Sequence, residues 1–256
     1  MPTVFIIAIA QALFFCFFLV TKKGSIIRRG LLMLWLSLIS FSLFLNYLYQ
    51  TEKINQLPHL IGLDTAFPFL YWPILYIYSK FLVAKKSSLT WKDLMHAIPF
   101  LGYFIYVFIS FYLESPQYKL EFLHKLFRGE VPLDIQISNF IKIIQALVYI
   151  ILIFRMIQHH QKTIQLNFSY TESINLKWLK IVTICLSNIY LLKFLGIISI
   201  YFNADSFLSR VEGISDLAVI VFVYIIAFYG IKQPDIFAKW KENIVADTNI
   251  DIVEES

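Results

Sequence analysis

The sequence has little charge and little cysteine. Only 15% of its residues are charged, whereas 59% are hydrophobic, above the roughly 45–50% that is usual in globular chains. A soluble chain of 256 residues could not bury so much apolar surface, so the composition indicates a membrane protein, with the bilayer as solvent. The two cysteines, Cys16 and Cys185, lie inside apolar runs, so nothing in the sequence supports a disulfide framework or a cysteine-based metal site.

Catalytic motifs are also missing from the sequence, which contains no HExxH, GxSxG, Walker or GxGxxG pattern. The adjacent His159 and His160 do not form a metal-binding face, because neighbouring helical positions point about 100° apart, and we interpret them as part of a solvated loop. We therefore expect no enzyme activity, no catalytic residue, no metal and no cofactor.

What the sequence does contain is a series of apolar runs, each close to the roughly 20 residues that cross a bilayer. The seven runs are residues 3–20, 30–49, 67–84, 96–113, 137–157, 177–202 and 214–231. They are continuously apolar rather than alternating, which favours helices over strands. The first run lacks a basic region before it and a small-residue cleavage site after it, so we interpret it as a retained span. The sequence predicts an all-α polytopic membrane protein, with a seven-helix transmembrane bundle over residues 1–237 and an acidic cytoplasmic tail or linker over 238–256.

Basic residues are distributed unevenly between the two sides of this bundle. One side carries Lys22, Lys23, Arg28, Arg29, Lys85, Lys86, Lys92, Arg155, Lys162, Lys177, Lys180, Lys232, Lys239 and Lys241. The other side carries Lys53, Lys119, Lys125, Arg128 and Arg210, in loops that also hold acidic residues. Because lysine and arginine favour cytoplasmic loops, we expect the N-terminus outside and the C-terminus in the cytoplasm.

Two loops have helical patterns of their own. "QYKLEFLHKLF" (117–127) places Leu120, Leu123 and Phe127 at helical spacing, with Lys119 and Lys125 elsewhere. This segment either lies on the outer membrane surface or packs as a short helix on the loops. "SYTE" (169–172) fits a capping box that would start a cytoplasmic helix leading into the sixth span.

Polar residues within or beside the spans gather in the predicted outer half of the bundle. The candidate ligand-binding residues are Lys142, Gln145, Lys193, Asp216 and Asp64. A lysine within a span is costly unless it pairs, extends to the interface or lines a wet cavity. The two interpretations are therefore structural lysines that extend outward, and a polar pocket between helices for a small, anionic signal molecule. We expect Lys142, Lys193 and Asp216 to approach one another.

Four segments, in order, resemble one family. They are "PHLIGLDTAFPFLYWPILYIYSKFL" (58–82), "WKDLMHAIPFLGYFIY" (91–106), "SYTESINLKWLK" (169–180) and "YGIKQPDIF" (229–237). Together they resemble the seven-transmembrane N-terminal module of bacterial, Bacteroidetes-type AraC-family membrane-bound transcriptional regulators, over most of residues 30–237. Trp72 stands where that family commonly has glycine. The resemblance implies a bacterial inner-membrane location and a sensory module followed by a cytoplasmic helix-turn-helix domain.

The helix-turn-helix part of that family does not match this chain. Only 19 residues follow Phe237, and residues 242–256 include five acidic residues and no lysine or arginine. DNA binding depends on cations that neutralise phosphates, so we expect no direct nucleic acid binding by this chain. Its expected partners are the bilayer, a small-molecule signal, and a cytoplasmic helix-turn-helix partner or missing C-terminal domain.

The function expected from these observations is a membrane-embedded sensory or regulatory module. It would sense an external or membrane signal and relay it through span seven. The alternative is a small seven-span transporter or permease, which would favour inverted repeats and charges at the bilayer midplane. The sequence has no visible internal repeat, and its intramembrane charges lie nearer the outer edge.

Overall fold

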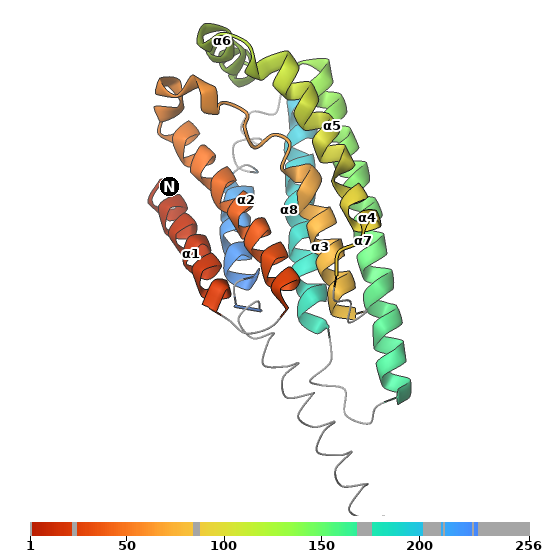
Figure 1. The fold of residues 1–256 in the computed structure, drawn as a ribbon. Helices are drawn as coiled ribbons and strands as arrows, with labels where there is room; N and C mark the ends of the chain where they lie inside the picture. Colours follow the sequence, from red (N-terminus) through yellow and green to blue (C-terminus); the bar gives the residue numbers. More distant parts are fainter. Residues whose placement is uncertain are drawn as a thin grey trace, which may run out of the picture.

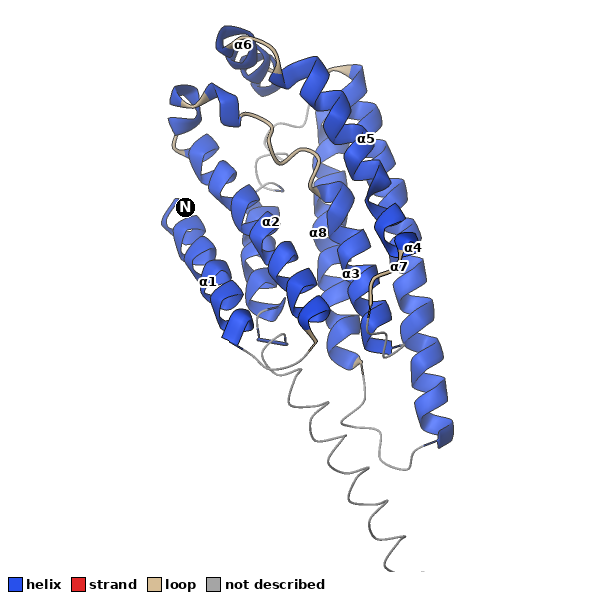
Figure 2. Cartoon of the chain, in the orientation of Figure 1, coloured by secondary structure: helices blue, strands red, loops and turns tan. Residues whose placement is uncertain are grey.

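The computed structural model describes residues 2–21, 25–83, 88–167, 176–201, 211, 213–226 and 228–229. Within these residues the chain is helical and has no strand (Figures 1 and 2). This confirms the all-α prediction. The capping box at 169–172, the Gln-Pro motif near 233 and the tail 238–256 lie outside the described residues.

Long helices run along one common axis (Figure 1). They are α1 (Pro2–Thr21), α2 (Ile26–Gln50), α3 (Pro68–Val83), α5 (Ile98–Val107), α7 (Leu133–Asn167), α8 (Lys177–Tyr201) and the helix Gly213–Ile226, here called the 213–226 helix. The shorter elements are η1 (Lys53–Gln56), η2 (Pro58–Leu60), α4 (Trp91–Leu94), η3 (Met95–Ala97), the π-helix η4 (Phe108–Tyr112) and α6 (Pro116–Phe127). We call the end of the bundle that carries η1, η2 and α6 the α6 end.

Five of the helical segments are long and apolar enough to cross a membrane. Within the described residues these are Thr3–Thr21, Ile26–Gln50, Trp91–Tyr112, Leu133–Lys162 and Lys177–Gly196, and they indicate a multi-pass membrane protein. The predicted third span forms α3, which has only 16 residues and is therefore about 24 Å long, less than the roughly 30 Å hydrocarbon core. The 213–226 helix is also short, so the count of seven spans stays a prediction.

Helix α3 is a short, mostly apolar helix that other helices surround. It contacts α2, α5 and α7, and ten of its residues are buried. Pro68 begins the helix, a position where the missing proline N–H costs nothing. Two aromatic contacts join neighbouring helices. The Trp72 ring of α3 packs edge-on against Tyr190 of α8, and Trp35 of α2 packs edge-on against Phe222 of the 213–226 helix.

The α4–η3–α5–η4 segment lies at the periphery of the bundle. Its side chains Leu101, Ile105, Phe108 and Ile109 are exposed, as expected for residues that face lipid. The segment widens into a π-helix at Phe108–Tyr112, a distortion that is frequent near functional sites.

Helix α6 packs on the connection between α2 and α3, against η2. The structure therefore supports the packed interpretation of residues 117–127. Leu123 is buried, but Phe127 is exposed. The prediction that Lys119 lies away from the apolar face is wrong, because its side chain is buried and only 1% exposed. Its position four residues before Leu123 places both residues on one helical face. The Lys119 Nζ donates to the Tyr112 carbonyl at 2.8 Å and lies over the Phe111 and Tyr112 rings.

Candidate functional site

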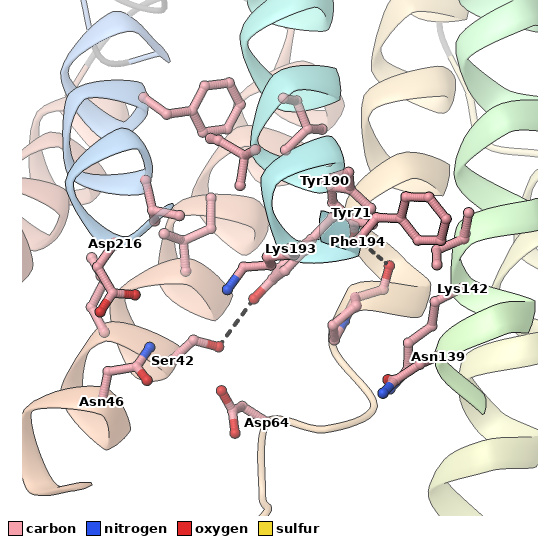
Figure 3. Close-up of a pocket in the computed structure, with 18 residues that line it drawn as sticks. Ser42, Asn46, Asp64, Tyr71, Asn139, Lys142, Tyr190, Lys193, Phe194 and Asp216 are labelled. Carbon is pink, nitrogen blue, oxygen red and sulfur yellow. Dashed lines mark hydrogen bonds between the residues drawn. The ribbon is translucent and has the colours of Figure 1, made fainter. Parts of the chain in front are cut away.

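A cavity of about 210 Å³ lies between α2, α3, α7, α8 and the 213–226 helix, toward the α6 end (Figure 3). We call it the inner cavity. Its walls are formed by Ile39, Ser42, Leu43, Asn46, Asp64, Pro68, Tyr71, Asn139, Lys142, Ile143, Leu186, Ile189, Tyr190, Lys193, Phe194, Asp216, Val219 and Phe222. An engineered cavity of about 150 Å³ holds a benzene molecule, so this one has room for a small ligand.

Four of the five predicted ligand-binding residues line the inner cavity: Lys142, Lys193, Asp216 and Asp64. Lys142, Lys193 and Asp216 come from three helices and line one cavity, but Lys142 lies on its opposite side (Figure 3), so the predicted approach holds for Lys193 and Asp216 only. A ligand-binding role for them is a separate claim, which the geometry alone does not test.

Among the described residues, Lys193 is the lysine whose charge acts on both acids of the cavity. It interacts electrostatically with both Asp64 and Asp216, and Figure 3 shows its side chain directed toward the side of the cavity that holds Asp216, Ser42 and Asp64. Within the described part of the chain, none of these charged groups forms an ion pair with another. The Asp216 carboxylate accepts a long hydrogen bond, 3.4 Å, from Gln50 Nε2.

Lys142 lies on the opposite side of the cavity, beside Asn139 (Figure 3). Its Nζ donates to Asn139 Oδ1 at 3.3 Å. The same ammonium lies 4.9 Å from the centre of the Tyr103 ring and 5.5 Å from that of Phe69, which are favourable cation–π distances. Lys142 is therefore stabilised by ring and amide contacts, and no described residue makes such contacts with Lys193.

Asp64 is held in place by the folded connection between α2 and α3. Gly62 has a φ of +74°, a conformation that glycine adopts without strain. Its N–H donates to the Tyr49 hydroxyl at 3.0 Å, and its carbonyl accepts from the Tyr112 hydroxyl. These bonds fix the turn two residues before Asp64 and direct that side chain to the cavity.

Burial raises the pKa of the Asp64 carboxyl above its ordinary value, because a partly enclosed site disfavours the charged form. A hydrogen bond from Ser42 and the positive charges of Lys193 and Lys142 act in the opposite direction. Asp64 thus titrates at a higher pH than a solvated aspartate.

Gln145 is the exception among the predicted residues, because it is not part of the cavity wall. Its Nε2 donates to the Phe69 carbonyl in α3 at 3.2 Å. That carbonyl lies four residues before Pro73, which has no N–H to donate within the helix. Gln145 supplies the missing donor across the helix interface, so its role in the structure is to support α3.

Several cavity residues were not predicted. The Ser42 and Tyr71 hydroxyls lie 3.1 Å apart, and the Tyr190 hydroxyl donates to the Pro68 carbonyl at 3.1 Å. Asn46 lies four residues after Ser42 and so faces the same side of α2. That spacing was the available signal, whereas Tyr71 and Tyr190 are not distinguishable in sequence from packing aromatics.

A second, more open cavity of about 910 Å³ adjoins the inner cavity at the α6 end. We call it the vestibule. Aromatic residues of α2, α5, η4 and α6 form much of its wall, including Tyr49, Tyr103, Phe111 and Phe122. Asn46, Lys193 and Asp216 belong to both cavities, so these polar groups lie where the vestibule meets the inner cavity.

Comparison of the chain with protein-family models, with curated proteins and with solved structures finds no match. The site is therefore interpreted from its own chemistry. Charged and hydrogen-bonding groups of both signs surround a space with apolar walls, an arrangement typical of sites that bind and orient a small polar molecule.

Proposed function

We propose that this chain is a membrane-embedded sensory module whose inner cavity receives a small polar signal molecule. The observation that carries the proposal is the set of charges of Lys193, Asp64 and Asp216 around one cavity, which form no ion pair with one another or with any other described residue. Charged groups within spans are costly, and they commonly mark a functional site where they line a cavity.

The proposed orientation places the α6 end outside the cell. The distribution of basic loop residues supports it, because lysine and arginine concentrate near the other end of the bundle. In this orientation the vestibule opens outward, in the bacterial inner membrane. The two short helices, α3 and the 213–226 helix, complete a seven-span bundle, with α3 surrounded by protein rather than lipid.

The proposed relay runs through the 213–226 helix. Asp216 near its start lines the inner cavity. Phe222 packs on Trp35 with ring centres 5.6 Å apart, and Tyr229 just beyond packs on Trp178 at 5.9 Å. A ligand that draws Asp216 toward it would therefore shift contacts along the helix toward the cytoplasm, and small helix shifts of this kind are common in switching proteins.

The class that this proposal fits is the AraC-type membrane-bound regulator, to which the sequence segments bear a resemblance. The signal would then reach a cytoplasmic helix-turn-helix domain or partner, and this chain would not itself bind DNA. A small permease is the alternative, and it is favoured by a charged cavity that adjoins an open vestibule.

A distance measurement combined with an uptake assay separates the two functions. Spin labels at Lys92→Cys and Phe228→Cys, in a Cys16→Ala/Cys185→Ala background in lipid nanodiscs, report the separation of α4 from the helical segment around Phe228. Small carboxylates, amines and zwitterions are first screened for binding, and the tightest binder is then added.

A sensor is expected to change the label separation and to show no uptake of the compound into proteoliposomes. The same change should be absent in an Asp216→Asn background. Uptake that depends on Lys193 would instead establish the permease, and binding with neither response would refute both functions.

A further inference from the structure

The charges of the inner cavity are mixed in sign, and this limits what can bind there. Lys193 interacts with two carboxylates, those of Asp64 and Asp216. A simple anion that approached Lys193 would also approach both acids, and like-charge contacts of this kind are costly. A simple cation would bind the acids but meet Lys193. The mixed charges therefore favour neither a simple anion nor a simple cation as the ligand.

Lys142 does not remove this constraint. Its ammonium is already placed over the Tyr103 and Phe69 rings and bonded to Asn139. It also lies on the other side of the cavity from Asp216 (Figure 3). The side of the cavity that joins the vestibule thus carries Lys193 and Asp216, with Asp64 in the adjoining wall. One lysine and two acids there change the expectation of an anionic signal.

The polar side of the cavity is complemented by neutral hydrogen-bonding groups. Asn46 is beside Asp216, and Ser42 lies between Asp216 and Asp64 in Figure 3. Each can donate or accept. A ligand that carries an ammonium and a carboxylate close together would find partners for both charges within this small space.

The remaining walls are apolar. Ile39 and Leu43 of α2 and Phe222 of the 213–226 helix contribute to them. The volume of about 210 Å³ exceeds the roughly 150 Å³ that accommodates benzene. One apolar side chain of moderate size therefore fits beside the charged groups.

We propose that the inner cavity binds a small zwitterion of the α-amino-acid type, with an apolar side chain. Lys193 binds the carboxylate, Asp216 with Asn46 binds the ammonium, and Asp64 provides the second negative charge. The side chain contacts Ile39, Leu43 and Phe222. This inference rests on the proposed function only in taking the inner cavity as the ligand site, and it does not depend on the relay or on the direction of signalling.

Three probes with similar carbon skeletons test the charge requirement. L-Leucine carries both charges, isovalerate only the carboxylate, and isoamylamine only the ammonium. Titration calorimetry with the full chain in nanodiscs should show leucine binding at least about tenfold more tightly than either analogue, because each analogue loses one set of charge-assisted hydrogen bonds.

Two variants should each remove the preference for leucine, one in favour of the amine and the other in favour of the carboxylate. Lys193→Gln should weaken leucine by at least about tenfold while isoamylamine binds at least as well as before. Asp216→Asn should weaken leucine similarly and leave isovalerate unaffected or improved. Lys125→Gln is the matched control, because Lys125 pairs with Glu121 on the exposed face of α6, away from the cavity, and it should not change any of the three affinities. Circular dichroism confirms that each variant is folded.

Each contrary outcome has a defined meaning. Isovalerate that binds as tightly as leucine would make the cavity an anion site, and equal binding of isoamylamine would make it a cation site. Failure of all three probes in the folded protein would also overturn the inference. Leucine binding without a change in label separation would refute the relay and leave the ligand class standing. If a compound that is not a zwitterion changes the label separation and leucine does not bind, the ligand class is refuted and the relay stands.

Discussion

Two groups of lysine and aspartate lie at opposite ends of the bundle and differ in whether their charges are paired. At the end away from α6, Lys80 Nζ lies 2.6 Å from Asp93 Oδ1. Asp93 Oδ2 also accepts from the Thr90 amide at 2.9 Å and the Thr90 hydroxyl at 2.6 Å. At the α6 end, Lys193, Asp64 and Asp216 share a cavity without forming an ion pair with one another.

The difference lies in what the charges leave accessible. Asp93 is almost completely buried, at 1% exposure, and its oxygens are bonded within the protein, so the pair closes the start of α4. Around the inner cavity, Asp216 accepts a long bond from Gln50 and Asp64 accepts one from Ser42, but neither acid forms an ion pair with a described lysine or arginine. We infer that the first group stabilises the fold and the second is available to a ligand.

The largest loss of stability is expected when the paired group is broken. Asp93→Ala removes both the ion pair and the capping box of α4, and should lower the free energy of unfolding by about 3 kcal/mol. Chemical unfolding in mild detergent measures this. Lys92→Ala, at the exposed neighbouring position, should change stability by no more than about 0.5 kcal/mol. Equal effects of the two changes would remove the contrast.

A smaller loss is expected from Gln145→Leu. It leaves the Phe69 carbonyl without its donor, which should cost about 1–3 kcal/mol. In a Pro73→Ala background the restored backbone N–H can take over, so the same change should cost less than half as much. Identical costs in both backgrounds would show that Gln145 does not compensate for Pro73.

Changes at the unpaired charges should have still smaller effects on stability. Lys193→Gln should alter the free energy of unfolding by less than about 1 kcal/mol, because Lys193 forms no ion pair with a described residue. Leucine binding should weaken as described above. A loss as large as that of Asp93→Ala would mean that Lys193 is a structural residue.

The smallest effect is expected from pH. Burial raises the pKa of Asp64, so lowering the pH from about 7.5 to about 5 protonates part of it, since aspartate ordinarily titrates near 3.9. Protonation removes a negative charge that helps to hold the ligand ammonium, so leucine affinity should fall a few-fold. The other titratable groups near Asp64 are Lys193, Lys142, Tyr71, Tyr49 and Tyr112.

Asp216 is the other acid in the cavity, so the Asp64→Asn variant is needed to assign this effect. In that variant the pH dependence should be reduced. Stability should depend on pH in the opposite direction to binding. A carboxyl whose pKa is raised by folding stabilises the folded state at pH values below its unfolded pKa, and this stabilisation is lost as the pH rises through its folded pKa. An unchanged pH profile in Asp64→Asn would assign the titration elsewhere.

Much of the fold was predictable because apolar length is a strong signal. The runs at 3–20, 30–49 and 137–157 correspond to α1, α2 and α7. The four charged residues of the cavity were predictable because the orientation rule placed Lys142, Lys193, Asp216 and Asp64 in one half of the bundle. The cost of burying charge then favoured an inward position.

What could not be predicted depends on contacts between distant segments. In sequence, Gln145 resembles a ligand-binding residue. Only the structure shows that it donates to the Phe69 carbonyl, which Pro73 cannot pair with. The difference between Lys193 and Lys142 depends on the rings of Tyr103 and Phe69. Similarly, the burial of Lys119 depends on the carbonyl that Tyr112 presents at the end of the π-helix.

The most direct test of the account is the accessibility of the inner cavity from outside the cell. Asn46→Cys, in the Cys16→Ala/Cys185→Ala background, is treated in intact cells with a membrane-impermeant thiosulfonate reagent. We expect rapid labelling that leucine slows, whereas Lys92→Cys at the other end is labelled only after permeabilisation. Labelling of Lys92→Cys in intact cells, or an Asn46→Cys that stays unreactive from both sides, would contradict an outward-facing ligand cavity.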